Sequence, residues 1–162
     1  MKPTPYFARI DFKEANNDTK KNIYIGISSL IDKTNNKNLI YDWRAPISSM
    51  FYDYSLGKAK YTCENGTIEG ELILKRQIKI SDGKIDYLID TNIKIDDEIL
   101  QEILSKSTSG KMEHIVTSIQ RQQNQVIRDD DNDLLIVQGS AGSGKTSIAL
   151  HRVAYLLYKY QK

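Results

Sequence analysis

Residues 139–146 read Gly-Ser-Ala-Gly-Ser-Gly-Lys-Thr and fit the pattern G-x-x-x-x-G-K-[ST] at every fixed position. An apolar run, Leu134–Val137, precedes this loop. Four consecutive apolar residues without alternation are typical of a strand buried on both faces. After the loop, a helix is expected from about Lys145 to Tyr160. A strand, a glycine-rich loop and a helix in this order predict a phosphate-binding loop, which restricts this half of the chain to an α/β arrangement.

Each position in the loop has a physical role in holding phosphate. Glycines let the backbone curl so that successive N–H groups converge on phosphate oxygens, and the following helix directs its positive end to the same place. We expect Lys145 to bind the β- and γ-phosphates and Thr146 to offer its hydroxyl to Mg²⁺, so these two are the catalytic candidates. The predicted nucleotide-binding residues around them are Gly139, Ser140, Ala141, Gly142, Ser143, Gly144 and Ser147.

Phosphoryl transfer also needs a second acid on Mg²⁺, usually at the end of another strand. Asp42 and Asp90 each end an apolar run, but both come before the loop and neither is expected to serve. No further strand is expected between Thr146 and Lys162. We therefore expect an incomplete site in a fragment of a longer protein, inactive by itself. The uncovered edges of Leu134–Val137 and the apolar side of the next helix predict self-association.

The composition and charge exclude several classes of protein and of binding site. Hydrophobic residues are 40% and charged residues 27%, as in ordinary folded domains. The net charge of +2 is too small to indicate nucleic-acid binding by its field alone. Cys63 is the only cysteine, which excludes an internal disulfide and a cysteine-cluster zinc site and favours a cytoplasmic location. No apolar run is long enough to span a bilayer, so no membrane partner is expected.

Residues 1–95 predict β-structure, because they are rich in isoleucine and tyrosine. Early candidate strands are Tyr6–Phe12, Asn22–Leu30 and Asn38–Tyr41. Asn65-Gly66 and Asp82-Gly83 predict two-residue hairpin turns, since such pairs tolerate positive φ. The pattern predicts a three-stranded meander within a small antiparallel sheet or barrel.

Counting outward from the two turns gives the register of the meander. The expected cross-strand pairs are Cys63 with Ile68, Ala59 with Leu72, Ile80 with Ile85, and Ile78 with Tyr87. Both turns then place the even-numbered apolar residues between them on one face: Ile68, Leu72, Leu74, Ile78 and Ile80. The opposite face carries Lys58, Lys60, Lys75 and Lys79. Because Glu69 and Glu71 share that face, we interpret it as a solvated surface, with a phosphate-backbone track as the alternative.

The residues on both sides of the loop resemble those of a known family. Ile119–Ile127 reads Ile-Gln-Arg-Gln-Gln-Asn-Gln-Val-Ile and resembles the Q motif of superfamily-one helicases of the UvrD/Rep type, with Gln120 where that family has Asn. The resemblance places Gln123 on the glutamine that reads the adenine edge, so ATP is the implied nucleotide. Leu150–Tyr155 resembles the H-R-[IV]-A-[WY] stretch of the same family. Arg152 is a candidate to approach the nucleotide, with seating of the helix as its alternative role.

The β-rich half narrows the resemblance. Tyr6–Phe12, Ile23–Ile27, Tyr41–Ser49 and Leu74–Gln77 look like the HelD family of UvrD-like ATPases, which bind RNA polymerase and release it from nucleic acid. This resemblance implies an α+β chain in which a small antiparallel β-rich domain (1–95) precedes a helix and linker (96–110). The implied third part (111–162) is the helix–strand–loop–helix start of a truncated RecA-like α/β domain. ATP, Mg²⁺, DNA and RNA polymerase are the implied ligands and partners.

Three functions follow from these residues. The first is an ATP-driven motor that releases RNA polymerase. The second is a conventional DNA helicase of repair or replication, which would share every ATP-site residue. The third is a docking module for RNA polymerase in residues 1–95. Within that module Trp43 and Arg44 could stack on a base or meet a partner, although burial of the tryptophan in the core is the expected outcome.

Overall fold

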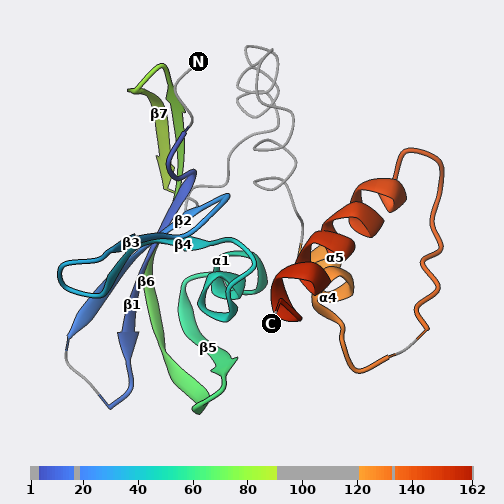
Figure 1. Cartoon of the computed structure of the whole chain (residues 1–162), viewed down its shortest axis with the longest axis horizontal. Coiled ribbons are helices and arrows are strands. Elements are labelled where there is room, and N and C mark those ends of the chain that lie inside the picture. The colour runs from blue at the N-terminus through green and yellow to red at the C-terminus, as the bar shows by residue number, and fades with distance from the viewer. Residues whose placement is uncertain (1–3, 17–18, 91–120, 133, 162) are drawn as a thin grey trace. The chain divides into compact units, whose positions relative to one another are not determined.

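The computed structural model describes residues 4–16, 19–90, 121–132 and 134–161. The chain divides into two compact units, residues 1–118 and 119–162 (Figure 1). The helix and linker expected over 96–110, and the start of the helix expected to open the third part (111–162), lie outside the described residues. Among the described residues, no helix has the length and apolar character needed to cross a bilayer.

The first unit is built on a seven-stranded sheet. The strands follow the order β3-β4-β2-β1-β6-β5, and β7 pairs with β6 off this path. Their bounds are β1 (Ala8–Glu14), β2 (Lys20–Gly26), β3 (Leu30–Asp32), β4 (Lys37–Asp42), β5 (Gly57–Cys63), β6 (Gly66–Ser81) and β7 (Lys84–Asp90). The three early strands predicted from the sequence are confirmed as β1, β2 and β4. The short strand β3 was not predicted.

The 16-residue strand β6 is the spine of this sheet. It pairs antiparallel with β1, with β5 along its first half and with β7 along its second half, as Figure 1 shows. The predicted meander β5-β6-β7 is therefore confirmed. The prediction of a purely antiparallel sheet is wrong, because β2 and β4 pair in parallel at Ile25–Tyr41 and Gly26–Asp42. The chain reverses once between β2 and β3 and again at the β3–β4 turn, so β4 runs alongside β2 in the same direction.

The two hairpin turns differ in how well the sequence placed them. Asp82 and Gly83 both have positive φ, of 51° and 81°, so the predicted turn and the Ile80–Ile85 pair are confirmed. In the other hairpin only Gly66 has positive φ, and Cys63 pairs directly with Gly66. The loop residues are therefore Glu64 and Asn65, and the register slips by two: Ile68 faces Tyr61, Leu72 faces Gly57 and Ala59 faces Gly70.

A bulge in β6 overturns the single apolar face predicted for this strand. Leu72 pairs with Phe12 and Leu74 with Asp11, which leaves Ile73 as the extra residue. Because of this extra residue, the side chains that follow it on β6 point to the face opposite the one predicted. Leu74 therefore leaves the core face, and Lys75 enters it opposite Ile10. A second irregularity, between Lys79 and Ile80, pairs Ile78 with Leu88 in place of Tyr87.

The two lysines beyond the bulge are consequently not on a solvated face. Lys75 Nζ donates to Tyr54 O at 2.9 Å and lies 5.1 Å from the Phe51 ring centroid. Burial lowers the pKa of this amine. Lys79 is buried as well. Lys58 and Lys60 behave as predicted, because they stand directly opposite Glu71 and Glu69 on β5 and β6.

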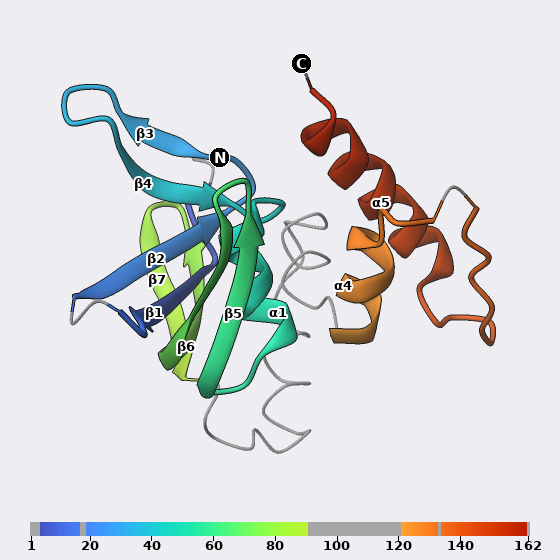
Figure 2. The same cartoon turned by 90° about the horizontal axis from the view of Figure 1, so that it is seen from below.

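The core lies on the face of the sheet that carries Ala8, Ile10 and Phe12. A 3₁₀ turn, η1 (Pro46–Ser48), and the short helix α1 (Ser49–Asp53) pack beside β5 and bury Met50, Phe51 and Tyr52 (Figures 1 and 2). Trp43 is 4% exposed, so its predicted place in the core is confirmed and stacking on a base is not available to it.

Asp42 anchors the segment that carries this tryptophan. Its carboxylate accepts hydrogen bonds from Arg44 N and Arg44 Nε at 2.8 Å and from Arg44 Nη2 at 2.7 Å. Its backbone carbonyl accepts from Ser48 Oγ at 2.7 Å. Trp43 N donates to Gly26 O at 2.9 Å, which fixes the segment to the end of β2. The Trp43–Arg44 segment is thus part of the internal hydrogen bonding of the sheet.

A row of charged and aromatic side chains crosses the other face of the sheet. Arg9 on β1 stands between Tyr24 on β2 and Arg76 on β6, and Arg76 stands opposite Asp90 on β7. Two arginines side by side repel each other, but each is bound by a carboxylate. Arg9 Nε lies 2.8 Å from Asp11 Oδ1 and Arg76 Nε lies 2.5 Å from Asp90 Oδ1. The carboxylates therefore make this row compatible with a stable sheet.

The second unit consists of α4 (Arg121–Arg128), α5 (Lys145–Lys159) and the segment between them. The predicted C-terminal helix is confirmed as α5. The predicted strand Leu134–Val137 is wrong, since the structure assigns no strand there and leaves Leu134 and Ile136 about 80% exposed. A parallel strand needs neighbours for its backbone hydrogen bonds, and the described residues of this unit offer none.

The pairing of Asp11 predicts how the first unit responds to acid. Burial would raise the pKa of Asp11, but hydrogen bonds from Arg9 and Lys20 outweigh it and hold the pKa below its usual value. The hydrogen bond from Arg76 likewise lowers the pKa of Asp90. A lowered carboxyl pKa adds stability above the unfolded value, about pH 4, and this stability disappears as pH falls through the folded pKa.

We therefore expect the wild-type chain to lose unfolding free energy below about pH 4 more steeply than Asp11→Asn does. Denaturant unfolding followed by the emission of Trp43, the only tryptophan, measures this. Glu64→Gln, in the exposed hairpin loop, is the control and should keep the wild-type slope. Equal slopes for wild type and Asp11→Asn would contradict the role of Asp11.

Candidate functional site

The glycines of residues 139–146 are required by the shape of the loop. Gly142 and Gly144 both have φ of +80°, a conformation that is costly for residues with a side chain. Gly139 has ordinary φ, but a Cβ at this position would lie 2.7 Å from Ser143 Oγ. Ser143 N donates to Ser140 O at 3.3 Å and closes the turn between them. Each glycine of the motif therefore has its own steric reason.

The ammonium of Lys145 lies over this loop. Its Nζ donates to Gly139 O at 2.9 Å and to Ser140 O at 2.6 Å, and it lies 3.5 Å from Ser143 Oγ. The lysine therefore bridges both ends of the curled segment. In this position the loop's own carbonyls hold a cation next to its backbone.

The helix α5 begins at the loop. Gly144 is its N-cap residue, and Ile148 N donates to Gly144 O at 2.9 Å to close the first turn. Lys145, Thr146 and Ser147 form that first turn, so their amides belong to the positive end of a 15-residue helix. Thr146 is exposed there, with its hydroxyl open to a ligand. Ile148 is buried and holds the start of the helix against the rest of the unit.

Gln123 is brought to this loop from α4, about 20 residues earlier in the chain. A Cβ built at Gly144 would lie 3.4 Å from Gln123 Nε2. The side-chain amide of the predicted base-reading residue therefore lies next to the N-cap of α5. Gln123 and the glycine-rich loop, which are separate in the chain, are therefore close together in the structure.

Arg152 lies two turns further along α5 and bonds to α4. Its Nη1 donates to Val126 O at 2.9 Å and also to Asp129 O. Val126 is in the last turn of α4, and Asp129 directly follows the helix. The structure thus places this guanidinium at the helix–helix contact, the alternative given above for this residue, and its approach to a nucleotide stays a prediction.

Several residues of the α4–α5 contact were missed in the sequence analysis. Asn124 is fully buried, and its Oδ1 accepts a hydrogen bond from Arg128 Nε at 3.0 Å. The Arg128 guanidinium lies 5.3 Å from the Tyr155 ring centroid, and Lys159 forms an ion pair with Asp130. The Asn124–Arg128 bond has the i, i+4 spacing of neighbours on one helix. The contacts of Arg128 with Tyr155 and of Lys159 with Asp130 have no such sequence signal, because they depend on how α5 packs against α4 and the segment after it.

His151, in the stretch that resembles the helicase family, is buried in the same helix. Its Nδ1 lies 2.6 Å from Ser147 O. Because a carbonyl only accepts, Nδ1 carries the proton and donates to the preceding turn. The ring therefore supports the first turn of α5.

The residues of the loop fit a triphosphate with its metal ion. Two left-handed glycines expose backbone amides, Lys145 supplies a cation, and the exposed hydroxyl of Thr146 is an oxygen ligand of the kind that Mg²⁺ prefers. Within the part of the chain that the structure describes, no cluster of three metal-binding side chains is present. Asp42 and Asp90, the two earlier candidates for a metal acid, are held by Arg44 and Arg76 in the first unit.

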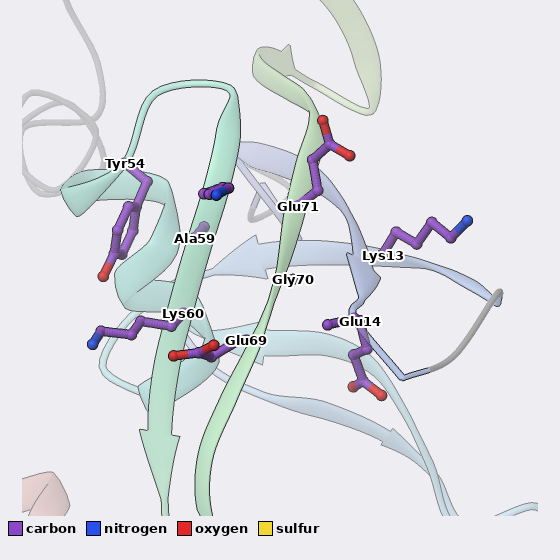
Figure 3. Close-up of a pocket in the computed structure, with 10 residues that line it drawn as sticks. Lys13, Glu14, Tyr54, Ala59, Lys60, Glu69, Gly70 and Glu71 are labelled. Atoms are coloured by element: carbon purple, nitrogen blue, oxygen red, sulfur yellow. The ribbon is translucent and has the colours of Figure 1, made fainter.

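A separate hollow of about 710 Å³ lies in the first unit between the end of β1 and the β5–β6 hairpin. Figure 3 shows Lys60 and Glu69 on the neighbouring strands β5 and β6. Its charged lining residues are Lys13, Lys58, Lys60, Glu14, Glu69 and Glu71. Because three positive and three negative groups alternate there, the hollow has no net charge to attract a phosphate. The loop at 139–146 is the stronger candidate site.

Comparison with known proteins adds information on the first unit. A family model described as DNA helicase IV HelD, N-terminal domain, matches residues 1–106. The loop and both described helices of the second unit lie beyond the matched range. A comparison with curated proteins finds no match.

Proposed function

This chain belongs to the DNA helicase IV HelD family through residues 1–106, and on that basis we propose that it is part of an ATP-driven, helicase-like motor. In this proposal the motor binds ATP with Mg²⁺ and uses hydrolysis to release RNA polymerase from nucleic acid. It works in the cytoplasm, where a lone thiol such as Cys63 stays reduced. Hydrolysis requires groups beyond those described here, so the isolated chain is expected to bind ATP without turning it over.

The placement of Gln123 against the P-loop is the observation that supports this proposal most. A glycine-rich loop alone occurs in many phosphate-binding proteins. An amide beside the N-cap of α5 adds a group that both donates and accepts hydrogen bonds, as recognition of an adenine edge requires. The pair of features therefore favours a nucleotide with a specific base over phosphate alone.

The proposed chemistry assigns a role to each residue of the loop. Lys145 leaves the carbonyls of Gly139 and Ser140 and transfers its hydrogen bonds to the β- and γ-phosphates. The amides of residues 142–147 hold the phosphate oxygens, and Thr146 orients the metal through its hydroxyl. When bound, Mg²⁺ supplies neutralisation of phosphate charge. The protein thus contributes positioning and electrostatic stabilisation, which dominate catalysis of phosphoryl transfer.

Removal of the lysine tests the phosphate site. We expect Lys145→Ala to weaken binding of ATP–Mg to the whole chain roughly 10- to 100-fold, because charge-assisted hydrogen bonds are lost. Isothermal titration calorimetry measures this affinity. Lys159→Ala removes the same charge from the other end of α5 and should bind like wild type. Equal affinity for Lys145→Ala and wild type would refute a phosphate site at this loop.

A docking role for the first unit is the second candidate, and the β3–β4 hairpin favours it. Leu30, Ile31 and Leu39 on this hairpin and Ile27 just before it are each at least 40% exposed. The loop that joins the two strands projects beyond the neighbouring strands in Figure 2. β3 is also an edge strand, with one side of its backbone open to pairing. A projecting apolar hairpin of this kind fits a protein partner better than a phosphate backbone, and we assign RNA polymerase as that partner.

Substitutions on this hairpin separate docking from ATP binding. We expect the double change Leu30→Thr and Ile31→Thr to weaken capture of core RNA polymerase about tenfold or more, because two exposed apolar contacts are removed. Lys145→Ala should capture polymerase as wild type does. Ile85→Thr, at an exposed apolar position on β7, is the matched control. Capture unchanged by the hairpin substitutions would exclude this docking surface. Failure of the wild-type chain to bind polymerase would favour a conventional DNA helicase.

A further inference from the structure

We propose that Arg152 is a positioning residue: by bonding the C-terminal end of α4 to α5, it keeps the amide of Gln123 at the P-loop and so sets the preference for the base. This inference rests on the proposed function, since it concerns recognition at the same nucleotide site. It assigns Arg152 no contact with the nucleotide itself.

The bonds of Arg152 have the geometry of a helix cap supplied by another helix. The last carbonyls of any helix lack partners within it and carry partial negative charge. Val126 O and Asp129 O are at this end of α4, and one nitrogen, Nη1 of Arg152, donates to both. A permanently charged donor therefore holds the last turn of α4 at one position along α5.

Gln123 lies three residues before Val126, about 4.5 Å along the axis of the same short helix. Any sliding or rotation of the last turn of α4 is therefore transmitted to Gln123 almost undiminished. The buried side chains of Asn124 and Ile127 limit movement of α4 perpendicular to its axis. The Arg128 guanidinium lies over the Tyr155 ring, whereas Arg152 makes the charged hydrogen bonds from α5 to the backbone at the end of α4.

The phosphate-binding groups do not depend on this contact in the same way. Residues 139–147 form the loop and the first turn of α5 itself, and their glycine conformations and lysine bonds are local. Hydrogen bonds weaken steeply when the donor moves or turns. Loss of Arg152 is thus expected to disturb recognition of the base and to spare binding of the phosphates.

Two ligands separate these effects: ATP and inorganic tripolyphosphate, each with Mg²⁺, titrated into the whole chain. We expect Arg152→Met, which keeps the aliphatic stem, to weaken ATP binding about tenfold and to change tripolyphosphate binding less than twofold. Gln123→Ala should have the same effect, and the double variant should lose no more than either single one. Arg152→Lys should recover part of the ATP affinity. Lys159→Met, which removes another contact between α5 and the segment after α4, is the control and should bind both ligands as wild type does.

Three results would overturn the assignment. Equal weakening of both ligands by Arg152→Met would make the residue a phosphate contact or a general folding determinant. Unchanged ATP affinity would remove its role altogether. Additive losses in the double variant would show that Arg152 and Gln123 act separately.

A direct NMR contact decides the same point without any nucleotide. The side-chain amide protons of Gln123 should show a nuclear Overhauser effect to Gly144 in the wild type and in Lys159→Met. The effect should disappear in Arg152→Met, and its persistence there would overturn the proposal. Wild-type protein that binds neither ATP nor tripolyphosphate would refute the proposed function, and this contact would still test Arg152.

Discussion

The backbone at Gly142 and Gly144, with φ of +80° at both residues, is the constraint on which the second unit depends. Two left-handed residues within three positions turn the chain back on itself just before α5. This turn brings the carbonyls of Gly139 and Ser140 within reach of the Lys145 ammonium, and it presents the first amides of the helix on the same side. Side chains at these positions would be strained, so the chemistry of the loop follows from its glycines.

The first unit depends in a similar way on one strand. β6 pairs with β1, β5 and β7. The extra residue Ile73 switches the side chains in the second half of β6 to the opposite face of the sheet. The bulge half-buries Lys75 against Tyr54 and Phe51 and brings Arg76 to the outer face beside Arg9. The Asp42 carboxylate and the bonds of its neighbours then close the core around Trp43. The β3–β4 hairpin at the edge of this sheet leaves Leu30, Ile31 and Leu39 exposed.

Local signals in the sequence predicted much of this fold. Asp82-Gly83 has two residues that tolerate positive φ, so its turn and the adjoining register were predictable. At Asn65-Gly66 only the glycine took positive φ, and the register slipped by two residues. The bulge at Ile73 has no marker in residue type, because it depends on pairing with β1. The strand predicted at Leu134–Val137 was wrong. Its residues favour a strand, but a strand forms only when a neighbouring strand pairs with it.

The candidate site also contains residues that the sequence predicted and residues that it did not. Residues 139–146 and Gln123 could be proposed as a site from the sequence alone, because the motifs depend on conformations and chemistry that each residue carries by itself. The contacts of Arg152 with Val126 O and Asp129 O, and of Arg128 with the Tyr155 ring, could not, since they arise only once two helices pack. The residues proposed to bind a ligand directly were therefore visible in the sequence, whereas those that place them were visible only in the structure.

A titration of the ¹⁵N-labelled chain with ATP–Mg, followed by amide chemical shifts, tests the central claim most directly. The account predicts saturable shifts at the amides of residues 139–147 and at the side-chain amide of Gln123, with the strands of the first unit unchanged. Shifts confined to the hollow between β1 and the β5–β6 hairpin, or no saturable shift at the loop, would contradict it.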